Sequence, residues 1–386
     1  MSKKDVMRFE LLMDAGNGAQ KAGDILIKTL AKSGRRVFIE PLIPAEISPP
    51  KRTPHSMSGA VIRVANKELL SIGSTTDLML VEHEILLERR LDDQDYDENC
   101  IILLDMAEER RAKDAYAAVI SRAEGLGLRV IPFSMNDASV DIIKELHGNG
   151  KNMYYLGMLA ALYQVPLDDV EKAVRVTFKK LSEEKLSKNI SILKYGYENA
   201  LSVAPETYEI SATEIGNDNV LLDGNTALSL GLIDSGYKLY SGYPITPASS
   251  IMHSLARIFP SYGGMVHQAE DEISAVGTAI GSYYAGVPSV TATSGPGLSL
   301  KQEFIGLAYA AEIPLVVVDV QRGGPSTGLP TRTEQTDLFA AVFGAHGDNA
   351  KVAISVANVE DCFYAPHVAR YLAEKLRMPV FILSDY

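Results

Sequence analysis

A loop between residues 321 and 331 gathers residue types suited to binding a carboxylate. It reads Gln-Arg-Gly-Gly-Pro-Ser-Thr-Gly-Leu-Pro-Thr. A planar guanidinium can hold a carboxylate through two parallel hydrogen bonds, which a lysine ammonium imitates poorly. Arg322, framed by glycines and threonines, is therefore a candidate carboxylate ligand. In the structural alternative, the same Gly and Pro residues only set turns.

Acidic residues cluster immediately before a helical pattern. Glu270, Asp271 and Glu272 precede apolar residues that recur at helical spacing between 273 and 280. Taken alone, acidic residues in a first turn suit the helix dipole, and this local pattern favours a purely structural role. Glu272 becomes a candidate for chemistry only through the loops that accompany it.

Three polar loops each follow a short β-branched or apolar run. They span residues 242–247 (Gly-Tyr-Pro-Ile-Thr-Pro), 293–297 (Thr-Ser-Gly-Pro-Gly) and 321–331. Parallel sheets place ligand-binding loops at the carboxyl ends of their strands. We therefore expect these loops to converge on one edge of a sheet.

The elements that must position these loops form two α/β domains. A chain of 386 residues is too long for one ordinary core. Short strands alternating with helices predict a mostly parallel sheet with helices on both faces in each half. We expect a first α/β domain at 1–190, a polar linker at 191–219 and a second domain at 220–386. In the second half, strands are expected at 238–241, 289–293, 314–320, 352–356 and 379–383.

Three glycine-containing fragments fall short of nucleotide or metal motifs. At residues 16–18, Gly-Asn-Gly starts a dinucleotide fingerprint, but Lys21 stands where the third glycine belongs. A tight strand-to-helix turn is the better interpretation. Asp-Gly-Asn at 223–225 lacks the full magnesium–diphosphate motif of thiamine enzymes and is interpreted as a turn before a helix, and residues 148–151 lack the P-loop spacing. The histidines show no metal-ligand spacing, so no metal site is predicted on this chain.

Composition excludes several classes of protein. The net charge of −12, without a basic stripe, argues against a nucleic-acid partner. No apolar run approaches the roughly 20 residues of a membrane helix, and no signal-peptide pattern appears, so we expect a cytoplasmic protein. The two cysteines, Cys100 and Cys362, cannot supply the four thiolates of an ordinary iron–sulfur cluster. Any single-electron carrier must therefore lie on another chain.

Taken together, the motifs resemble the α subunit of 2-oxoacid:ferredoxin oxidoreductases. The resemblance rests on four segments in the expected order, namely 242–247, 270–273, 291–297 and 321–331 with Glu334-Gln335. The 2-oxoglutarate type is the nearest match. The first domain resembles the γ domain that this family often fuses ahead of α, through residues 16–20 and 58–63, although Ala19 and Lys21 replace glycines usual in the family.

The resemblance implies a function that the chain performs with partners. The second domain would be the pyrimidine-binding domain for thiamine diphosphate, shared with a β subunit that carries the Mg²⁺–diphosphate motif and the cysteines of a [4Fe–4S] cluster. The complex would oxidatively decarboxylate a 2-oxoacid, with coenzyme A as co-substrate and ferredoxin as electron acceptor.

The resemblance also assigns roles to individual residues. Glu272 aligns with the glutamate that contacts the aminopyrimidine ring and favours its imino tautomer, so that the cofactor does the chemistry and the protein sets its tautomer. Arg322 and Thr331 match residues that grip the substrate carboxylate. Pro244, Ile245 and Thr246 match cofactor-contacting positions, and Thr246 also lies beside the substrate.

Relatives commonly continue past a segment like 381–385 into a further domain implicated in coenzyme A binding. Because this sequence stops at Tyr386, that domain is expected on a separate chain, or the sequence is a truncated product, or the enzyme works without it. Two alternative functions stay open: a subunit of a thiamine-diphosphate decarboxylase or transketolase-like enzyme without ferredoxin, and a non-catalytic paralogue. The sequence leaves open which 2-oxoacid is used, the oligomeric state, the direction of catalysis and the role of the γ-type domain.

Overall fold

The chain forms two compact units, Met1–Leu221 and Leu222–Tyr386, each described here by itself. The computed structural model describes residues 2–44, 49–203, 207–213 and 219–385. Within these ranges, no helix is long and apolar enough to cross a membrane.

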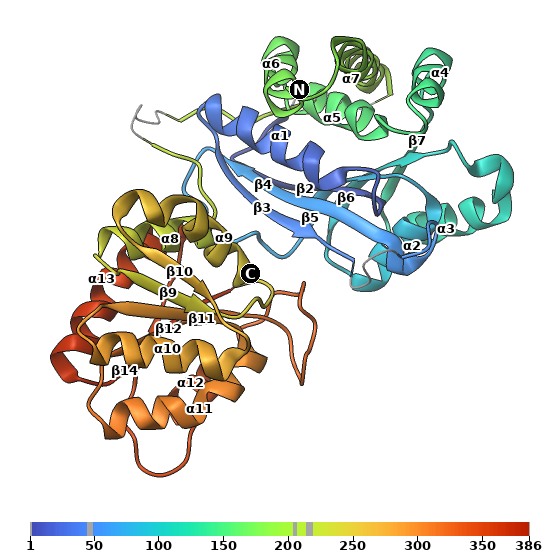
Figure 1. The fold of residues 1–386 in the computed structure, drawn as a ribbon. Coiled ribbons are helices and arrows are strands. Elements are labelled where there is room, and N and C mark those ends of the chain that lie inside the picture. The colour runs from blue at the N-terminus through green and yellow to red at the C-terminus, as the bar shows by residue number, and fades with distance from the viewer. Residues whose placement is uncertain (1, 45–48, 204–206, 214–218, 386) are drawn as a thin grey trace. The chain divides into compact units, whose positions relative to one another are not determined.

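The first unit is built on a six-stranded sheet of order β3-β4-β2-β5-β6-β7 (Figure 1). Its strands are β1 (Ser2–Lys3), β2 (Val6–Asp14), β3 (Arg36–Leu42), β4 (Met57–Ala65), β5 (Thr76–Val81), β6 (Tyr96–Asp105), β7 (Arg129–Phe133) and β8 (Tyr208–Glu209). Its helices are α1 (Ala19–Lys32), α2 (Glu84–Asp93), α3 (Lys113–Gly125), α4 (Asp137–Glu145), α5 (Lys151–Leu162), α6 (Leu167–Thr177) and α7 (Glu183–Val203), with single 3₁₀ turns at η1 (Pro54–Ser56) and η2 (Glu109–Arg111).

Alternation along the central strand of this unit sets its two cores. Phe9, Leu11 and Met13 of β2 join a hydrophobic cluster with α1, α5, α6 and α7, whereas Leu12 joins a second cluster with α2 and α3. Successive side chains of a strand point to opposite faces, so β2 contributes residues to the hydrophobic clusters on both faces of the sheet. Strands β2, β5, β6 and β7 are mutually parallel, and β4 runs antiparallel to both of its neighbours.

The predicted linker at 191–219 is wrong in its first part. Residues 191–203 belong to α7, which packs closely along α5: a Cβ at Gly157 would meet the Leu193 carbonyl oxygen at 2.0 Å. Residues 207–213 return to the first unit, where β8 pairs with β1 and the Thr213 amide donates to the Gly34 carbonyl at 2.7 Å. Residues 204–206 and 214–218 of the predicted linker lie outside the described residues. The domain ends at 190 and 220 stay predictions.

The second unit carries a six-stranded, wholly parallel sheet of order β10-β9-β11-β12-β14-β13. Its strands are β9 (Leu239–Gly242), β10 (Met265–Gln268), β11 (Ser289–Thr293), β12 (Leu315–Gln321), β13 (Val352–Ser355) and β14 (Pro379–Asp385). Its helices are α8 (Gly224–Asp234), α9 (Ser249–Ile258), α10 (Glu272–Tyr284), α11 (Gly295–Ala310), α12 (Leu338–Phe343) and α13 (Val359–Leu376), with the 3₁₀ turn η3 (Phe259–Tyr262).

Helices cover both faces of this second sheet. Val316, Val318 and Val320 of β12 pack with α8, α9 and α13, while Leu315 and Val317 pack with α10, α11 and α12 (Figure 1). The predicted fold class is therefore confirmed: two mostly parallel α/β sheets, each with helices on both faces. The strand that the sequence missed is β10, a short edge strand of half-exposed and polar residues without a continuous apolar run.

Candidate functional site

The three predicted loops do meet at one edge of the second sheet. Residues 242–247 follow β9, residues 293–297 follow β11 and residues 321–331 follow β12, and all three strands are parallel neighbours. Strand β10 ends at the same edge and leads into α10. We call this the carboxyl edge of the second sheet.

Glu272 is the first residue of α10 and is 7% exposed. The preceding residue, Asp271, caps the helix by accepting a hydrogen bond from the Ser274 amide at 2.7 Å. A Cβ at Gly297 would lie 2.1 Å from Thr293 Oγ1 and 2.9 Å from Glu272 Cγ, so only glycine fits there. The predicted pair of motifs, 270–273 and 291–297, is thus in direct contact, and the Glu272 side chain is held against the turn after β11.

A buried lysine lies beneath this glutamate. Lys301 of α11 is 0% exposed, and its Nζ donates to the Glu272 carbonyl oxygen at 2.9 Å. Burial lowers the pKa of Lys301 to about 8, while the nearby Glu272 and Asp271 act in the opposite direction. Sequence reasoning missed Lys301, although its place between Leu298 and Ile305 on the apolar face of α11 was a signal.

Arg322 joins two of the predicted loops. Its guanidinium donates from Nη1 to the Thr246 carbonyl at 2.7 Å and from Nη2 to the Thr327 carbonyl. The residue is 7% exposed, and burial lowers its pKa while Asp337 opposes that shift. Since a guanidinium carries five N–H groups, three remain after these two contacts. One of them, on Nε, is buried and has no partner among the described residues.

The remaining predicted residues lie in the two loops that Arg322 joins. Pro244 and Thr246 are exposed, and Ile245 packs partly against the core. Thr331 is half-buried and lies in a loop that folds back on itself, with Gly323 and Leu329 forming an isolated antiparallel bridge. No hydrogen bond between Glu272 and Arg322 occurs among the described residues, so the two side chains mark separate parts of the carboxyl edge.

Several buried polar atoms at this edge lack a hydrogen-bond partner within the described parts of the chain. They are the hydroxyls of Ser241, Thr291 and Ser294, each on a residue that is 0% exposed. Leaving such groups unpaired is costly, so they suit a polar ligand or bound water. Glu272, held at the helix start beside glycine at 297, has the carboxyl group needed to hydrogen-bond a ring nitrogen.

Comparison with known proteins supports the same assignment. Residues 231–386 match the family described as pyruvate flavodoxin/ferredoxin oxidoreductase, thiamine diphosphate-binding, and residues 14–199 match the pyruvate ferredoxin/flavodoxin oxidoreductase family. The chain belongs to the 2-oxoacid:ferredoxin oxidoreductase family. The second unit is thus of the thiamine-diphosphate-binding type.

Several of the similar proteins are named as 2-oxoglutarate enzymes. The Mycobacterium tuberculosis 2-oxoglutarate oxidoreductase subunit KorA is 33% identical, over 96% of this chain and 59% of its own length. The Methanothermobacter marburgensis 2-oxoglutarate synthase subunit KorA is 47% identical over 44% of this chain and 45% of its own. The structure of Magnetococcus marinus 2-oxoglutarate:ferredoxin oxidoreductase, with 2-oxoglutarate, coenzyme A and succinyl-CoA bound, superimposes with a TM-score of 0.86 at 32% identity and covers 99% of this chain. The chain spans 64% of that longer structure.

The glycine turn of the first unit is filled by side chains of the same unit. Gly16 and Gly18 have φ values of 86° and 88°, which other residues rarely adopt. The space where a Cβ at Gly18 would lie is filled by Asn152 Nδ2 at 2.6 Å. Asn17 donates to Glu82, whose carboxylate also accepts from Lys151 Nζ at 2.8 Å.

The Asp-Gly-Asn fragment at 223–225 has a structural role. Asp223 caps α8, with its carboxylate accepting from the Thr226 amide at 2.8 Å. Gly224 and Asn225 are the first two residues of the helix, so the fragment is a capped helix start and not the predicted turn before it. No group of three or more His, Cys, Asp or Glu side chains suited to a metal ion occurs in the described ranges. Both cysteines are free and buried.

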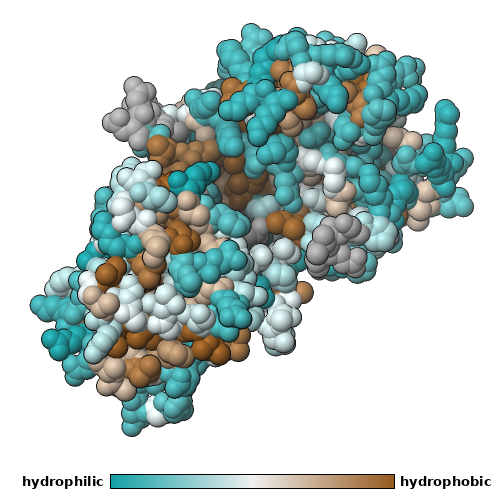
Figure 2. Space-filling view, viewed as in Figure 1, coloured by the Kyte–Doolittle hydropathy of each residue, from teal (hydrophilic) through white to brown (hydrophobic). Residues whose placement is uncertain are grey.

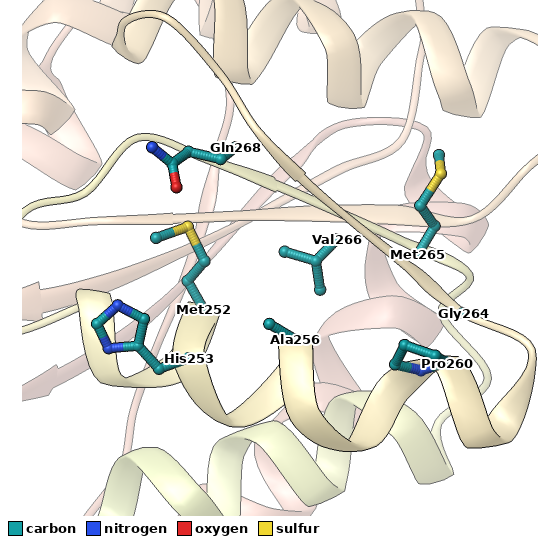
Figure 3. A pocket seen from close by; sticks show the side chains of 8 residues that line it. All are labelled: Met252, His253, Ala256, Pro260, Gly264, Met265, Val266 and Gln268. Carbon is teal, nitrogen blue, oxygen red and sulfur yellow. The ribbon is translucent and has the colours of Figure 1, made fainter.

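A shallow groove of about 530 Å³ lies between α9 and the edge strand β10 (Figure 3). Its lining is mainly apolar, with His253 and Gln268 as polar members, and none of the predicted site residues lines it. It contains no carboxylate, lysine or arginine. The predicted site residues therefore lie at the carboxyl edge and not in this groove.

Proposed function

We propose that this chain is the γ/α subunit of a thiamine-diphosphate-dependent 2-oxoacid:ferredoxin oxidoreductase. The complex would convert a 2-oxoacid, with 2-oxoglutarate as the first candidate, to its acyl-CoA and CO₂ and pass electrons to ferredoxin. The single observation that carries the proposal is the packing of Glu272 against the 293–297 turn at the carboxyl edge. The similarity to 2-oxoglutarate enzymes over nearly the whole chain supports the choice of substrate.

Within this proposal each residue has a physical task. Thiamine diphosphate, when bound, supplies the carbon nucleophile that 2-oxoacid decarboxylation needs. Glu272 would hold a proton between its carboxyl oxygen and the ring nitrogen of the aminopyrimidine, and its burial would exclude competing water. Pro244, Ile245 and Thr246 would line the cofactor.

Arg322 and Thr331 would bind the substrate carboxylate. Arg322 is already oriented by two backbone carbonyls, so its remaining N–H groups can be offered without a further loss of side-chain entropy. A bidentate guanidinium–carboxylate contact would fix the 2-oxoacid in one orientation.

The chain would need partners to complete the reaction. We propose a β subunit that supplies the Mg²⁺–diphosphate site and a [4Fe–4S] cluster, because the described residues of this chain offer no metal cluster. Ferredoxin would dock on the complex, and coenzyme A would enter as co-substrate. A separate coenzyme A-binding chain is a further proposed partner. The fully assembled enzyme is proposed to be cytoplasmic.

The test uses the complex purified with its co-expressed β subunit. Glu272→Gln keeps the shape of the side chain but weakens its control of the ring proton. We expect the rate of 2-oxoglutarate-dependent, coenzyme A-dependent dye reduction to fall by about 10²–10⁴-fold, the usual range for a lost proton-transfer group.

The matched control is Glu270→Gln, which changes an exposed acid two residues away. It should keep full activity. Undiminished activity in the Glu272 variant would remove the assignment, and an active but colourless complex without a cluster would instead favour a thiamine enzyme that does not use ferredoxin.

A further inference from the structure

A second acidic group lies at the carboxyl edge, deeper than any residue assigned so far. Asp319 is on β12, paired in register with Thr293 on β11 and Leu383 on β14. It is 0% exposed, and it points to the same face as Leu315 and Val317, among the apolar side chains under α10, α11 and α12. A carboxyl group in that position needs a compensating partner.

Asp337 supplies that partner. It precedes α12, and its amide donates to Gln321 Oε1 at 3.0 Å. Its carboxyl is within hydrogen-bonding contact of the Asp319 carboxyl. A Cβ at Gly295 would lie 2.7 Å from Asp337 Oδ1, so the start of α11 closes the third side of the pair.

The two carboxyl groups have almost nothing else to bind. Neither oxygen of Asp319, nor Oδ2 of Asp337, has a hydrogen-bond donor in the parts of the chain that the structure describes. Asp319 is fully buried and Asp337 is half-buried. Two carboxylates in such contact are not both charged, because their repulsion and the desolvation of Asp319 act together. A proton between them removes the repulsion and supplies the missing donor.

We propose that Asp319 and Asp337 share one proton, and that this hydrogen bond fastens the loop 322–337 to the sheet, making Asp319 a positioning residue for Arg322. The proton-sharing stands on the packing of the pair. The consequence for substrate binding rests on the proposed function, in which Arg322 grips the 2-oxoacid. We call residues 322–337 the Arg322 loop.

The surroundings of the pair decide where the proton lies. Burial raises the pKa of Asp319 well above its ordinary value, and contact with Asp337 adds to that rise. Burial also raises the pKa of Asp337, but the Asp319 hydrogen bond and the Arg322 charge act against the shift. The complete burial of Asp319 favours the proton on that residue, and the Arg322 charge favours the negative charge on Asp337. With one proton, the set of Asp319, Asp337 and Arg322 is electrically neutral.

Several contacts of the Arg322 loop are more exposed than this pair. Gln335 Nε2 donates to Asp385, and the Gly324 amide donates to Glu334 at 3.3 Å, and both contacts are open to water. Thr336 Oγ1 contacts the Arg322 carbonyl only at 3.5 Å. Exposed contacts of this kind stabilise little, so the Asp319–Asp337 pair and the Arg322 bond to the Thr246 carbonyl act together in attaching the loop.

The pH dependence follows from the direction of the shift. Because the folded protein holds the Asp319 proton more tightly than the unfolded chain does, this group favours folding at acidic pH. Its contribution is lost as pH rises from the ordinary aspartate range through the raised folded value. An amide in place of the acid keeps the donor and removes this pH-dependent loss.

The experiment compares Asp319→Asn, Asp319→Leu and Asp337→Asn in the full chain. Asp319→Asn can donate to Asp337, so its thermal midpoint should equal or exceed that of the unchanged chain, with a margin that grows from pH 6 to pH 9. Asp319→Leu leaves Asp337 unpaired and should lower the midpoint by at least about 5 °C. Asp337→Asn removes the charge that faces Arg322 and should be more harmful than Asp319→Asn.

A spectroscopic readout tests the proton directly. In neutral D₂O buffer, the difference infrared spectrum of the unchanged chain minus Asp319→Asn should contain the C=O stretch of a protonated carboxylic acid. The control is Asp105→Asn in the first unit, another aspartate that is 0% exposed but that has donors in Tyr155 and an adjacent lysine. The Asp105→Asn substitution should lower the thermal midpoint of the chain, unlike Asp319→Asn.

The functional arm uses the assembled complex. Asp319→Leu should raise KM for the 2-oxoacid by about tenfold, the equivalent of one hydrogen bond, with a smaller change in kcat, and Asp319→Asn should restore it. The proton-sharing is overturned if the infrared spectrum lacks the carboxylic acid band. It is also overturned if Asp319→Asn lowers the thermal midpoint as much as Asp319→Leu does. An unchanged KM in Asp319→Leu overturns the positioning role. The unfolding and infrared measurements do not depend on enzyme activity. They therefore test the proton-sharing independently of the proposed function, which the Glu272 variant tests.

Discussion

Asp105 and Asp319 occupy similar places in the two units, each fully buried near the carboxyl end of a central parallel strand. Their surroundings differ. Asp105 accepts hydrogen bonds from Tyr155 Oη at 2.6 Å and the Ala107 amide at 2.9 Å, and Lys151 Nζ lies 3.8 Å away. Asp319 has only Asp337.

The carboxyl edges of the two sheets differ in how their charged side chains are paired. In the first unit, the Glu82 carboxylate accepts hydrogen bonds from Asn17 and Lys151 beside the glycine turn. Unpartnered buried polar atoms occur at both edges among the described residues: His83 Nδ1 and Glu84 Oε2 in the first unit, and several hydroxyls and Arg322 Nε in the second. Both edges therefore hold buried polar groups that suit a ligand or bound water.

The outer faces differ as well. Figure 2 shows mostly hydrophilic side chains over α4, α6 and α7 of the first unit, and apolar side chains over the α10–α11 side of the second. Leu300 and Leu307 of α11 are 56% and 45% exposed, and Phe339 and Phe343 of α12 stack on each other while exposed by more than 70%. Exposed apolar residues of this kind, when gathered together, mark protein-binding surfaces.

The largest expected effect contrasts one glycine from each edge. Gly297→Ala should reduce the activity of the complex by more than about 100-fold. The added Cβ would overlap the side chains of Thr293 and Glu272 and push both out of position. Gly18→Ala should lower the thermal midpoint of the chain but leave turnover of the folded fraction unchanged. Steady-state kinetics with unfolding curves separates the two.

If Gly18→Ala abolished turnover in folded enzyme, the first edge would also be a reaction site. Gly281→Ala is the control, since its Cβ would meet no atom within 4 Å on α10. It should be neutral or slightly stabilising, by up to about 1 kcal/mol.

Arg322→Lys is expected to have the next largest effect. Lysine keeps the positive charge but cannot reach two carbonyls and a carboxylate with one planar group, so kcat/KM should fall by about 10–100-fold, mainly through KM. Arg332→Lys changes an exposed neighbour in the same loop and should have no effect. Equal kinetics in both variants would show that the guanidinium geometry is not used.

Lys301→Met tests the difference between the two units through the pH dependence of folding stability. The folded pKa of Lys301 is lowered to about 8, so the folded chain binds this proton less tightly than the unfolded chain. Lys301 therefore lowers the free energy of unfolding below pH 8, and this destabilisation disappears as pH rises from 8 toward 10.5.

Lys301→Met should raise the thermal midpoint by a few degrees at pH 7, and the difference should shrink by pH 10. Scanning calorimetry across this range measures it. Lys151→Met, at the carboxyl edge of the first unit, is the matched opposite: the Lys151 ammonium has carboxylate partners that raise its pKa, and the variant should lose stability at pH 7. A loss of stability in both variants would contradict the contrast.

The smallest effect is expected for the cysteines, one in each unit. Cys100 and Cys362 are buried, and burial raises the pKa of both thiols, that of Cys362 to about 12. Neither thiolate is available at neutral pH. An alkylating reagent at pH 8 should modify neither residue without denaturant, as mass spectrometry would record, and activity should be unchanged. Rapid labelling of either cysteine in the native chain would contradict this burial.

Local sequence was enough for features that depend on neighbouring residues. The strand predicted at 289–293 is found at those residues, and the helix predicted beside the acidic residues 270–272 is also present. β-branched runs, capping carboxylates and glycines act on their own backbone. The same locality explains why the three polar loops could be assigned to one edge, since parallel strands bring their carboxyl ends together.

Other features could not be read from neighbouring residues. The antiparallel direction of β4 and the packing of α7 on α5 depend on segments far along the chain, and α7 looked like a polar linker because only one face of it is buried. Edge strand β10 lacks an apolar run because one side of it faces water. Each of these is decided by what packs against the element.

The sequence by itself determined the fold class, the carboxyl edge of the second sheet and the candidates Glu272 and Arg322, because motif order and strand periodicity are written along the chain. Only the tertiary structure brought Lys301 under Glu272 and Asp319 against Asp337. These contacts join residues on different elements, and their energetics arise from shared burial away from water, where a charge must find a partner or lose or gain a proton. No stretch of sequence records that environment.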